Sequence, residues 1–298
     1  MSQHDSYGSL EGFPTADLPD TSRKDQQTLP VQTPPKLDIV HVTKTFFPYS
    51  VNERVALDDL SLTLADGDFV TIIGSNGAGK STLLSVIAGV YRPDRGVIAM
   101  DGWDVTRLPE HSMARRVGRV FQDPMAGTAP DLTIEENMAV ALHRGTTRGL
   151  GRGVTAAKKE HFRNELAILG LGLENRLTTK VGYLSGGQRQ ALSLVMAVFS
   201  RPSILLLDEH TAALDPARAE LITRITAQEV SAHKLTTLMV THNMDQALRL
   251  GNRLILMHEG RIELELNGEQ KARSSVDDLL EQFAQRTSGA VSDRTLLS

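Results

Sequence analysis

The chain has 298 residues, of which 40% are hydrophobic and 23% charged, with no cysteine and a net charge of −4. These values are typical of a globular protein with one large or two modest domains, and they exclude disulfides and thiolate metal sites. They also give no sign of a basic surface for nucleic acid, and no apolar run approaches the roughly 20 residues of a membrane-spanning helix.

The first 35 residues are polar and lack the apolar segment of a secretion signal. We interpret residues 1–35 as a disordered N-terminal extension, with a docking tail as the alternative. Two strands are predicted next, at Leu37–Val42 and Val55–Leu64, and they flank a turn at Pro48–Glu53.

A glycine-rich segment, Gly74–Ser81, has the form G-x-x-x-x-G-K-[ST]. It follows an apolar run that predicts a strand, Phe69–Ile73, and it opens a predicted helix, Ser81–Ala88. In such a loop the backbone N–H groups hold phosphate oxygens, the lysine reaches the β- and γ-phosphates, and the hydroxyl binds Mg²⁺. The residues expected to bind the nucleotide are Gly74, Ser75, Asn76, Gly77, Ala78, Gly79, Lys80, Ser81 and Thr82.

The middle of the chain changes from strands to helices. Short strands are predicted at Gly96–Asp101 and Val117–Phe121, and residues 123–183 are predicted to form an inserted helical subdomain. Its helices are expected at Thr133–His143 and Ala156–Leu169, with an exposed loop between them at 144–153.

The remaining residues alternate between helices and strands, which predicts an α/β core. Ser185 with Gln188, and Asp215 with Pro216, are expected to begin two of these helices. The predicted elements are a helix at 185–200, a strand at 204–208, a helix at 216–232, a strand at 236–241, a helix at 243–250, a hairpin of 253–258 and 261–267, and a helix at 276–285 before a flexible tail at 286–298.

Two carboxylates, Asp208 and Glu209, end the apolar strand at 204–208. Ligands of α/β sheets bind at the carboxyl ends of the strands, so Asp208 is expected to hold the Mg²⁺ that Ser81 touches. Glu209 is expected to act as the general base that orients or deprotonates a water. The alternative is an acidic pair that caps the next helix.

Gln122 and His242 also end predicted strands that reach the same sheet edge. The Gln122 amide could bind the metal and a water, and a neutral His242 could donate a hydrogen bond to the γ-phosphate. The alternatives are a solvated loop residue for Gln122 and a structural histidine for His242.

Ser185-Gly186-Gly187 is a second glycine-rich helix start, which offers free N–H groups and a hydroxyl to an anion. The chain has only one phosphate-binding loop of the first kind. A two-fold homodimer accounts for both glycine-rich anion sites, if Ser185 and Gly187 of one subunit contact the nucleotide that is bound to Lys80 of the other. The alternative is a helix cap with close backbone packing.

These segments together resemble the nucleotide-binding domain of ABC transporters over residues 37–285. The matching positions, in order, are GSNGAGKST (74–82), Gln122, LSGGQ (184–188), ILLLDE (204–209), Ala213-Leu214-Asp215 and His242. The resemblance implies an ABC domain over 36–285, with a P-loop NTPase core sheet, an N-terminal antiparallel β subdomain and an inserted α-helical subdomain. It also implies an ATPase that uses ATP and Mg²⁺.

The resemblance implies roles for single residues as well. Gln122 would sense the metal and a membrane partner, Ser185 and Gly187 would contact the opposite ATP, and Asp215 would be the D-loop residue. Asp208 would be the Walker B carboxylate, Glu209 the base and His242 the switch histidine. Phe46 is expected to stack on adenine, with Phe47 and Tyr49 competing for that role. His210 stands where the family usually has proline, and we expect it to add a contact at the dimer interface.

The class of ABC protein follows from what the chain contains. A single cassette in which Ser185 follows Gln122 by 63 positions resembles an importer subunit at the cytoplasmic face of a membrane, acting with permease subunits and a solute-binding protein. The segments at 121–137 and 205–216 resemble a subgroup paired with ribose/branched-chain-type permeases, some of whose members are linked to aromatic amino acids such as tryptophan. The alternative is a soluble ABC-type ATPase that remodels a cytosolic or nucleic-acid partner.

Overall fold

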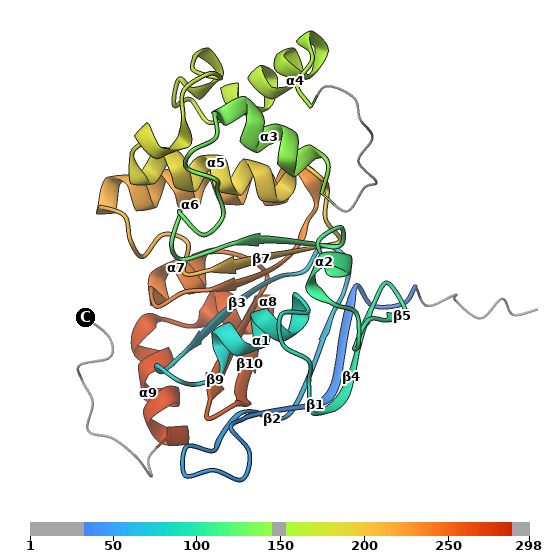
Figure 1. Cartoon of the computed structure of the whole chain (residues 1–298). Helices are drawn as coiled ribbons and strands as arrows, with labels where there is room; N and C mark the ends of the chain where they lie inside the picture. The colour runs from blue at the N-terminus through green and yellow to red at the C-terminus, as the bar shows by residue number, and fades with distance from the viewer. Residues whose placement is uncertain (1–32, 145–152, 288–298) are drawn as a thin grey trace, which may run out of the picture. The chain divides into compact units, whose positions relative to one another are not determined.

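The computed structural model describes residues 33–144 and 153–287. Within these ranges strands and helices alternate as the sequence predicts, so the α/β prediction is confirmed (Figure 1). The extension at 1–35, the loop at 144–153 and the tail at 286–298 fall almost entirely outside the described residues. None of the helices in the two described ranges has the length and apolar character needed to cross a membrane.

Six strands form the central sheet, in the order β10-β9-β3-β8-β7-β6. All neighbouring pairs are parallel except β9 and β10, which form the predicted antiparallel hairpin. The carboxyl ends of the parallel strands therefore meet at one edge, where α/β sheets bind ligands. The bounds are β3 Phe69–Gly74, β6 Val117–Val120, β7 Ile204–Asp208, β8 Thr236–Val240, β9 Arg253–His258 and β10 Arg261–Leu266.

A second, antiparallel sheet has the order β2-β1-β4-β5. Its first strand continues to Phe46, beyond the predicted end at Val42, because irregularities in the register keep it paired with β2 until Phe46 lies opposite Arg54. This extension carries Phe46 to the ligand edge. The bounds are β1 Leu37–Phe46, β2 Arg54–Leu64, β4 Arg95–Met100 and β5 Trp103–Asp104.

The predicted helices are all present, and the Ser185–Gln188 capping box and the Asp215 cap with Pro216 are confirmed. The sequence missed β5, α2, α8 and two 3₁₀ turns, because elements this short show no hydrophobic period. The bounds are α1 Lys80–Ile87, α2 Glu110–Met113, α3 Ile134–Leu142, α4 Ala156–Ala167, α5 Gly186–Val198, α6 Pro216–His233, α7 Met244–Arg249, α8 Gly268–Arg273 and α9 Val276–Thr287, with 3₁₀ turns at Leu173–Asn175 and Val181–Tyr183.

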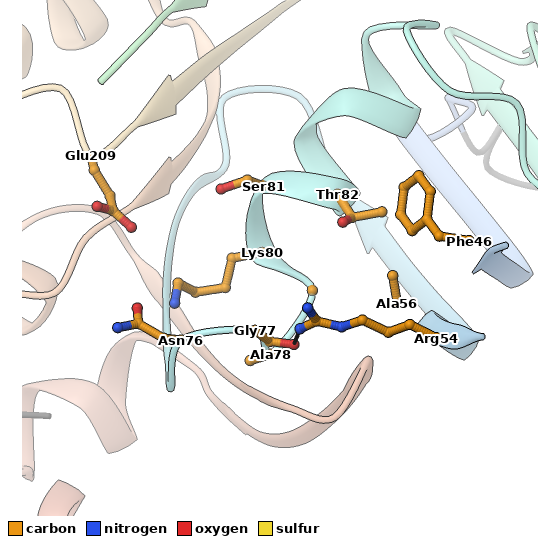
Figure 2. A pocket seen from close by; sticks show the side chains of 11 residues that line it. Phe46, Arg54, Ala56, Asn76, Gly77, Ala78, Lys80, Ser81, Thr82 and Glu209 are labelled. Atoms are coloured by element: carbon orange, nitrogen blue, oxygen red, sulfur yellow. Dashed lines mark hydrogen bonds between the residues drawn. The ribbon is translucent and has the colours of Figure 1, made fainter. Parts of the chain in front are cut away.

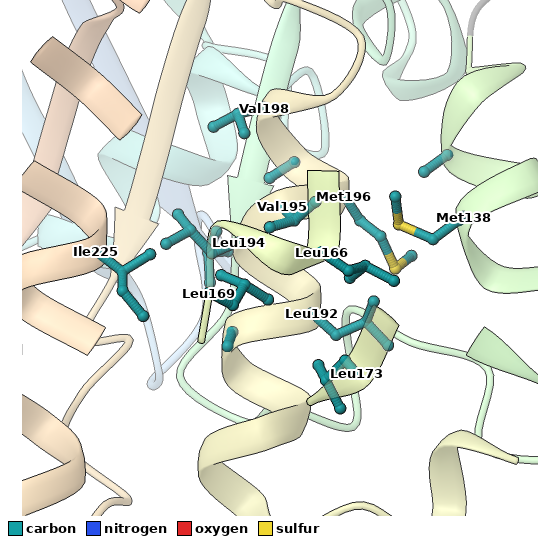
Figure 3. Close-up of a cluster of buried hydrophobic side chains, with 14 of the residues drawn as sticks. Met138, Leu166, Leu169, Leu173, Leu192, Leu194, Val195, Met196, Val198 and Ile225 are labelled. Carbon is teal, nitrogen blue, oxygen red and sulfur yellow. The ribbon is translucent and has the colours of Figure 1, made fainter. Parts of the chain in front are cut away.

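The central sheet separates two hydrophobic cores. Successive side chains of a strand face opposite sides, so Leu205 and Leu207 join the core under α3–α6, while Ile204 and Leu206 join the core around α1 and the antiparallel sheet. Figure 3 shows the first core, in which α5 is surrounded by apolar side chains of neighbouring helices. Packing on both faces fixes β7 firmly, and with it the position of the two carboxylates at its end.

Candidate functional site

The loop between β3 and α1 forms one wall of a cavity of about 260 Å³ (Figure 2). In this view Glu209 lies on one side, Phe46 and Arg54 lie on the other, and Lys80 lies between them. The lining residues are Phe46, Arg54, Ala56, Asn76, Gly77, Ala78, Gly79, Lys80, Ser81, Thr82 and Glu209. Seven of the nine loop residues predicted from the sequence therefore face the cavity.

The other two loop residues, Gly74 and Ser75, do not line the cavity but contact Lys80 through their carbonyl oxygens. Lys80 Nζ donates hydrogen bonds to the carbonyl oxygens of Gly74, at 2.7 Å, and Ser75, at 3.0 Å. Burial lowers the pKa of Lys80, while the negative charges of Glu209 and Asp208 act in the opposite direction. The ammonium group is thus held at the loop, where it faces any phosphate that the N–H groups bind.

Two glycines of the loop have no room for a side chain. A Cβ on Gly74 would lie 2.2 Å from the carbonyl oxygen of Met257, and one on Gly79 would lie 2.3 Å from that of Ala56. Both residues also have positive φ angles, 153° and 99°. The loop therefore packs directly against the backbone of β9 and β2.

Ser81 and Asp208 meet beside this loop. Ser81 Oγ donates a hydrogen bond to Asp208 Oδ1 at 3.1 Å, and Arg119 Nη2 lies 3.3 Å from Asp208 Oδ2. A hydroxyl and a carboxylate in contact are hard oxygen donors of the kind that Mg²⁺ prefers. The donor chemistry at this point fits the predicted magnesium ion.

Glu209 and His242 lie next to each other, because they follow adjacent parallel strands. His242 Nε2 is 2.6 Å from Glu209 Oε1. The Glu209 N–H donates to the Val240 carbonyl at 3.0 Å, and its φ of 47° is in the left-handed region, which turns its side chain into the cavity. The Glu209 side chain is 12% exposed and that of His242 is 41% exposed. The sequence placed both at this edge, but it did not predict that they contact each other.

The aromatic side of the cavity is formed by Phe46, whose ring packs edge-on against Tyr91 with centroids 5.1 Å apart. Phe47 is 68% exposed and Tyr49 is fully exposed. Sequence reasoning missed Arg54, whose Nη2 donates to the Gly77 carbonyl at 2.9 Å. Its only signal in the sequence is its place opposite Phe46, at the other end of the predicted turn.

Eight predicted site residues do not line this cavity in the described part of the chain. Four of them, Gly74, Ser75, Asp208 and His242, contact residues that do line it. The other four are Gln122, Ser185, Gly187 and Asp215. Gln122 is exposed after β6. The other three lie where α5 and α6 begin side by side. Ser185 caps α5, and Asp215 caps α6. Arg218 links the two helices, because it pairs with Asp215 at 3.3 Å and packs against Gly187. The three residues form a second cluster, away from the loop of their own chain.

The expected interface contact of His210 is wrong. Its side chain lies inside the chain, only 2% exposed, with Nε2 3.0 Å from Thr226 Oγ1. The Thr226 hydroxyl already donates to the Ile222 carbonyl, so the histidine Nε2 is the donor in this contact. Burial lowers the pKa of His210 to about 4, which leaves the ring neutral near pH 7.

Comparison with known proteins gives consistent matches. A family model described as "ABC transporter" matches residues 57–212. A tyrosine transport ATP-binding protein of Clostridioides difficile is 42% identical over 83% of this chain and 98% of that protein. A methionine import ATP-binding protein, MetN, of Brucella abortus is 32% identical over 81% of this chain. A spermidine/putrescine import ATP-binding protein, PotA, of Pseudomonas aeruginosa is 34% identical over 78% of it. The chain spans 64% and 59% of the length of these last two relatives.

Solved structures share the fold. A dimeric post-hydrolysis state of the ATP-binding cassette MJ0796, bound to ADP and Pi, aligns with a TM-score of 0.67 and 29% identity over 78% of this chain and 98% of that one. The ADP conformation of the cassette MJ1267 aligns with a TM-score of 0.67 and 26% identity over 84% of this chain and 99% of that one.

Proposed function

The chain belongs to the ABC transporter family, and on this basis we propose that it is the ATP-binding and ATP-hydrolysing subunit of an importer of a small organic solute. The observation that carries the proposal is the joint placement of Lys80, the Ser81–Asp208 pair and the Glu209–His242 pair at one sheet edge. This arrangement provides a phosphate site, a metal site and a base within reach of each other.

The chemistry can be assigned residue by residue. The loop N–H groups and Lys80 bind the phosphates, and Ser81, Asp208 and, from its loop, Gln122 hold Mg²⁺, which neutralises phosphate charge when bound. Glu209 accepts a proton from the attacking water, and His242 orients the Glu209 carboxylate. Phe46 stacks on the adenine ring.

Ser185, Gly187 and Asp215 act in a homodimer. They lie at helix N-termini that offer N–H groups, yet they do not face the cavity of their own chain. In a two-fold dimer they complete the partner's ATP site, an arrangement supported by the dimeric structure of the MJ0796 cassette.

Mixing two inactive variants tests this dimer. Lys80→Ala lacks its own phosphate lysine, and Ser185→Arg blocks the site of its partner. Each alone should hydrolyse no ATP, whereas a mixture should regain at most about a quarter of the wild-type rate, because only mixed dimers contain one intact site. A mixture as inactive as its components would contradict the shared site.

The transport role comes from the relatives. The tyrosine transport protein supports an aromatic amino acid as the solute, and the segments at 121–137 and 205–216 support a permease of the ribose/branched-chain type. We place the ABC domain at 36–285, between an extension at 1–35 and a tail at 286–298. The domain acts at the cytoplasmic face of the membrane with permease subunits and an extracytoplasmic solute-binding protein.

Affinity purification from the native cell tests the transport role. The tagged chain should be recovered from detergent-solubilised membranes together with an integral membrane protein, and ATP hydrolysis by that complex should rise when the solute and its binding protein are added. Recovery of the chain from cytosol with RNA or a cytosolic protein, and without a membrane protein, would instead support the soluble remodelling ATPase.

A further inference from the structure

Arg119 contacts the carboxylate that we assign to the metal. It lies on β6, beside β7, and its Nη2 is 3.3 Å from Asp208 Oδ2 and 3.3 Å from Ser85 Oγ on α1. The two charged side chains are only 15% and 12% exposed. This is a largely buried ion pair that reaches the cavity through Ser81, and none of the sequence motifs includes the arginine.

Three neighbours hold the guanidinium in one place. Its central carbon lies 4.7 Å from the centre of the Phe121 ring, which provides a cation–π contact. Ser85 Oγ accepts a hydrogen bond from Arg119 Nη2, and Asp208 provides the balancing charge. Arg119 Nε is buried without a hydrogen-bond partner among the described residues, so Asp208 is the main compensation for this buried charge.

The two oxygens of Asp208 therefore have different neighbours. Oδ2 faces Arg119, and Oδ1 faces the Ser81 hydroxyl. The terminal torsion of an aspartate is soft and turns easily unless a neighbour fixes it. We propose that Arg119 is a positioning residue that holds Oδ2, presents Oδ1 beside Ser81, and so sets the affinity of the site for Mg²⁺.

Two other roles for Arg119 would affect Mg²⁺ binding differently. A purely structural ion pair would change the stability of the fold and leave Mg²⁺ affinity alone. A cation this close to the metal site could also act mainly by repulsion, in which case its removal would strengthen Mg²⁺ binding. Removing a group that hydrogen bonds to a metal ligand typically lowers metal affinity about 10- to 100-fold. We therefore expect the loss of positioning to outweigh the relief of charge repulsion when Arg119 is removed.

The test measures binding rather than turnover. The full-length chain with a fluorescent ATP analogue is titrated with Mg²⁺, for the wild type, Arg119→Met, Arg119→Lys and the control Arg115→Met, which changes an exposed arginine in the same region. Arg119→Met should raise the Mg²⁺ concentration at half-saturation roughly tenfold. Arg119→Lys should raise it less, because lysine keeps the charge but loses the planar fork. Arg115→Met should match the wild type.

Nucleotide affinity in EDTA should be nearly the same in all four proteins, since the phosphate loop is unchanged. Thermal unfolding checks that each variant folds, and Arg119→Lys tests the idea even if Arg119→Met does not fold. An unchanged or lower Mg²⁺ midpoint in folded variants would overturn the positioning role. This role rests on the proposed function, which fails separately if wild-type nucleotide binding does not depend on Mg²⁺ at all.

Discussion

His242 Nε2 lies 2.6 Å from Glu209 Oε1, across the ends of the adjacent parallel strands β8 and β7. The carboxylate belongs to a residue in a left-handed backbone conformation, so the chain accepts local strain to turn it toward the cavity. The imidazole then fixes the direction of that carboxylate. In the function that we propose, the two residues act as one unit: Glu209 is the general base, and His242 orients its carboxylate.

Glu209→Gln should abolish hydrolysis and preserve nucleotide binding. The amide keeps the shape of the side chain but cannot accept the proton of the attacking water, so the rate of phosphate release should fall at least about 100-fold. Nucleotide affinity should change little, and size-exclusion chromatography with ATP and Mg²⁺ should show a longer-lived dimer. Hydrolysis at the wild-type rate would show that Glu209 is not the base.

His242→Ala should lower hydrolysis through its effect on Glu209. The single change removes the contact that orients the carboxylate, and a loss of at least about tenfold is expected. Because the two residues act as a unit, the double variant His242→Ala/Glu209→Gln should be no slower than Glu209→Gln alone. Independent, multiplicative losses would mean that His242 acts on the nucleotide and not through Glu209.

Phe46→Ala should weaken ATP binding about tenfold, because an aromatic ring stacked on a base contributes roughly 1–3 kcal/mol. Phe47→Ala is the matched control, since the neighbouring ring is 68% exposed and does not line the cavity. Binding of ATP by fluorescence titration separates the two variants. Equal losses, or a loss confined to Phe47→Ala, would assign the stacking role to another residue.

Buried Lys271 should make the stability of the fold depend on alkaline pH. Its side chain is 4% exposed, and burial lowers its pKa from 10.5 to about 8. Between these two values the unfolded chain binds more protons than the folded chain, so the free energy of unfolding rises with pH. After allowance for partial solvent screening, we expect a rise of about 1 kcal/mol across this window.

Urea unfolding near pH 7.5 and near pH 9.5 measures this effect when the wild type is compared with Lys271→Met. The variant should lack the rise, whereas Lys180→Met, which changes an exposed lysine, should retain it. If all three proteins show the same change in stability with pH, Lys271 stays charged in the fold throughout this range.

The parts of the site that depend on local sequence could be predicted. The loop from Gly74 to Lys80 is continuous, so its residue spacing alone defines a phosphate site. Asp208 and Glu209 follow an unbroken apolar strand, and the end of such a strand must lie at the ligand edge of the sheet. The helix caps Ser185 and Asp215 could also be predicted, because a cap and its helix are neighbours in sequence.

Other contacts depend on register and packing, which one sequence does not reveal. Arg54 reaches Gly77 only because the irregular pairing of β1 and β2 places it opposite Phe46. Arg119 reaches Asp208 because alternation along β6 points it toward α1. We expected His210 to contact the dimer interface because it stands where the resembled family usually has proline. Instead it is buried, and its ring lies against Thr226 of α6.

The close packing of Gly74 and Gly79 has a consequence for inheritance. Any missense change in a glycine codon adds a Cβ, and at these two positions that atom would lie 2.2–2.3 Å from a backbone oxygen that belongs to another strand. No conservative allele exists at either codon. A population of cells that depends on this protein should therefore carry silent variation at these two codons but no amino-acid polymorphism. At Lys80, by contrast, arginine would at least keep the positive charge.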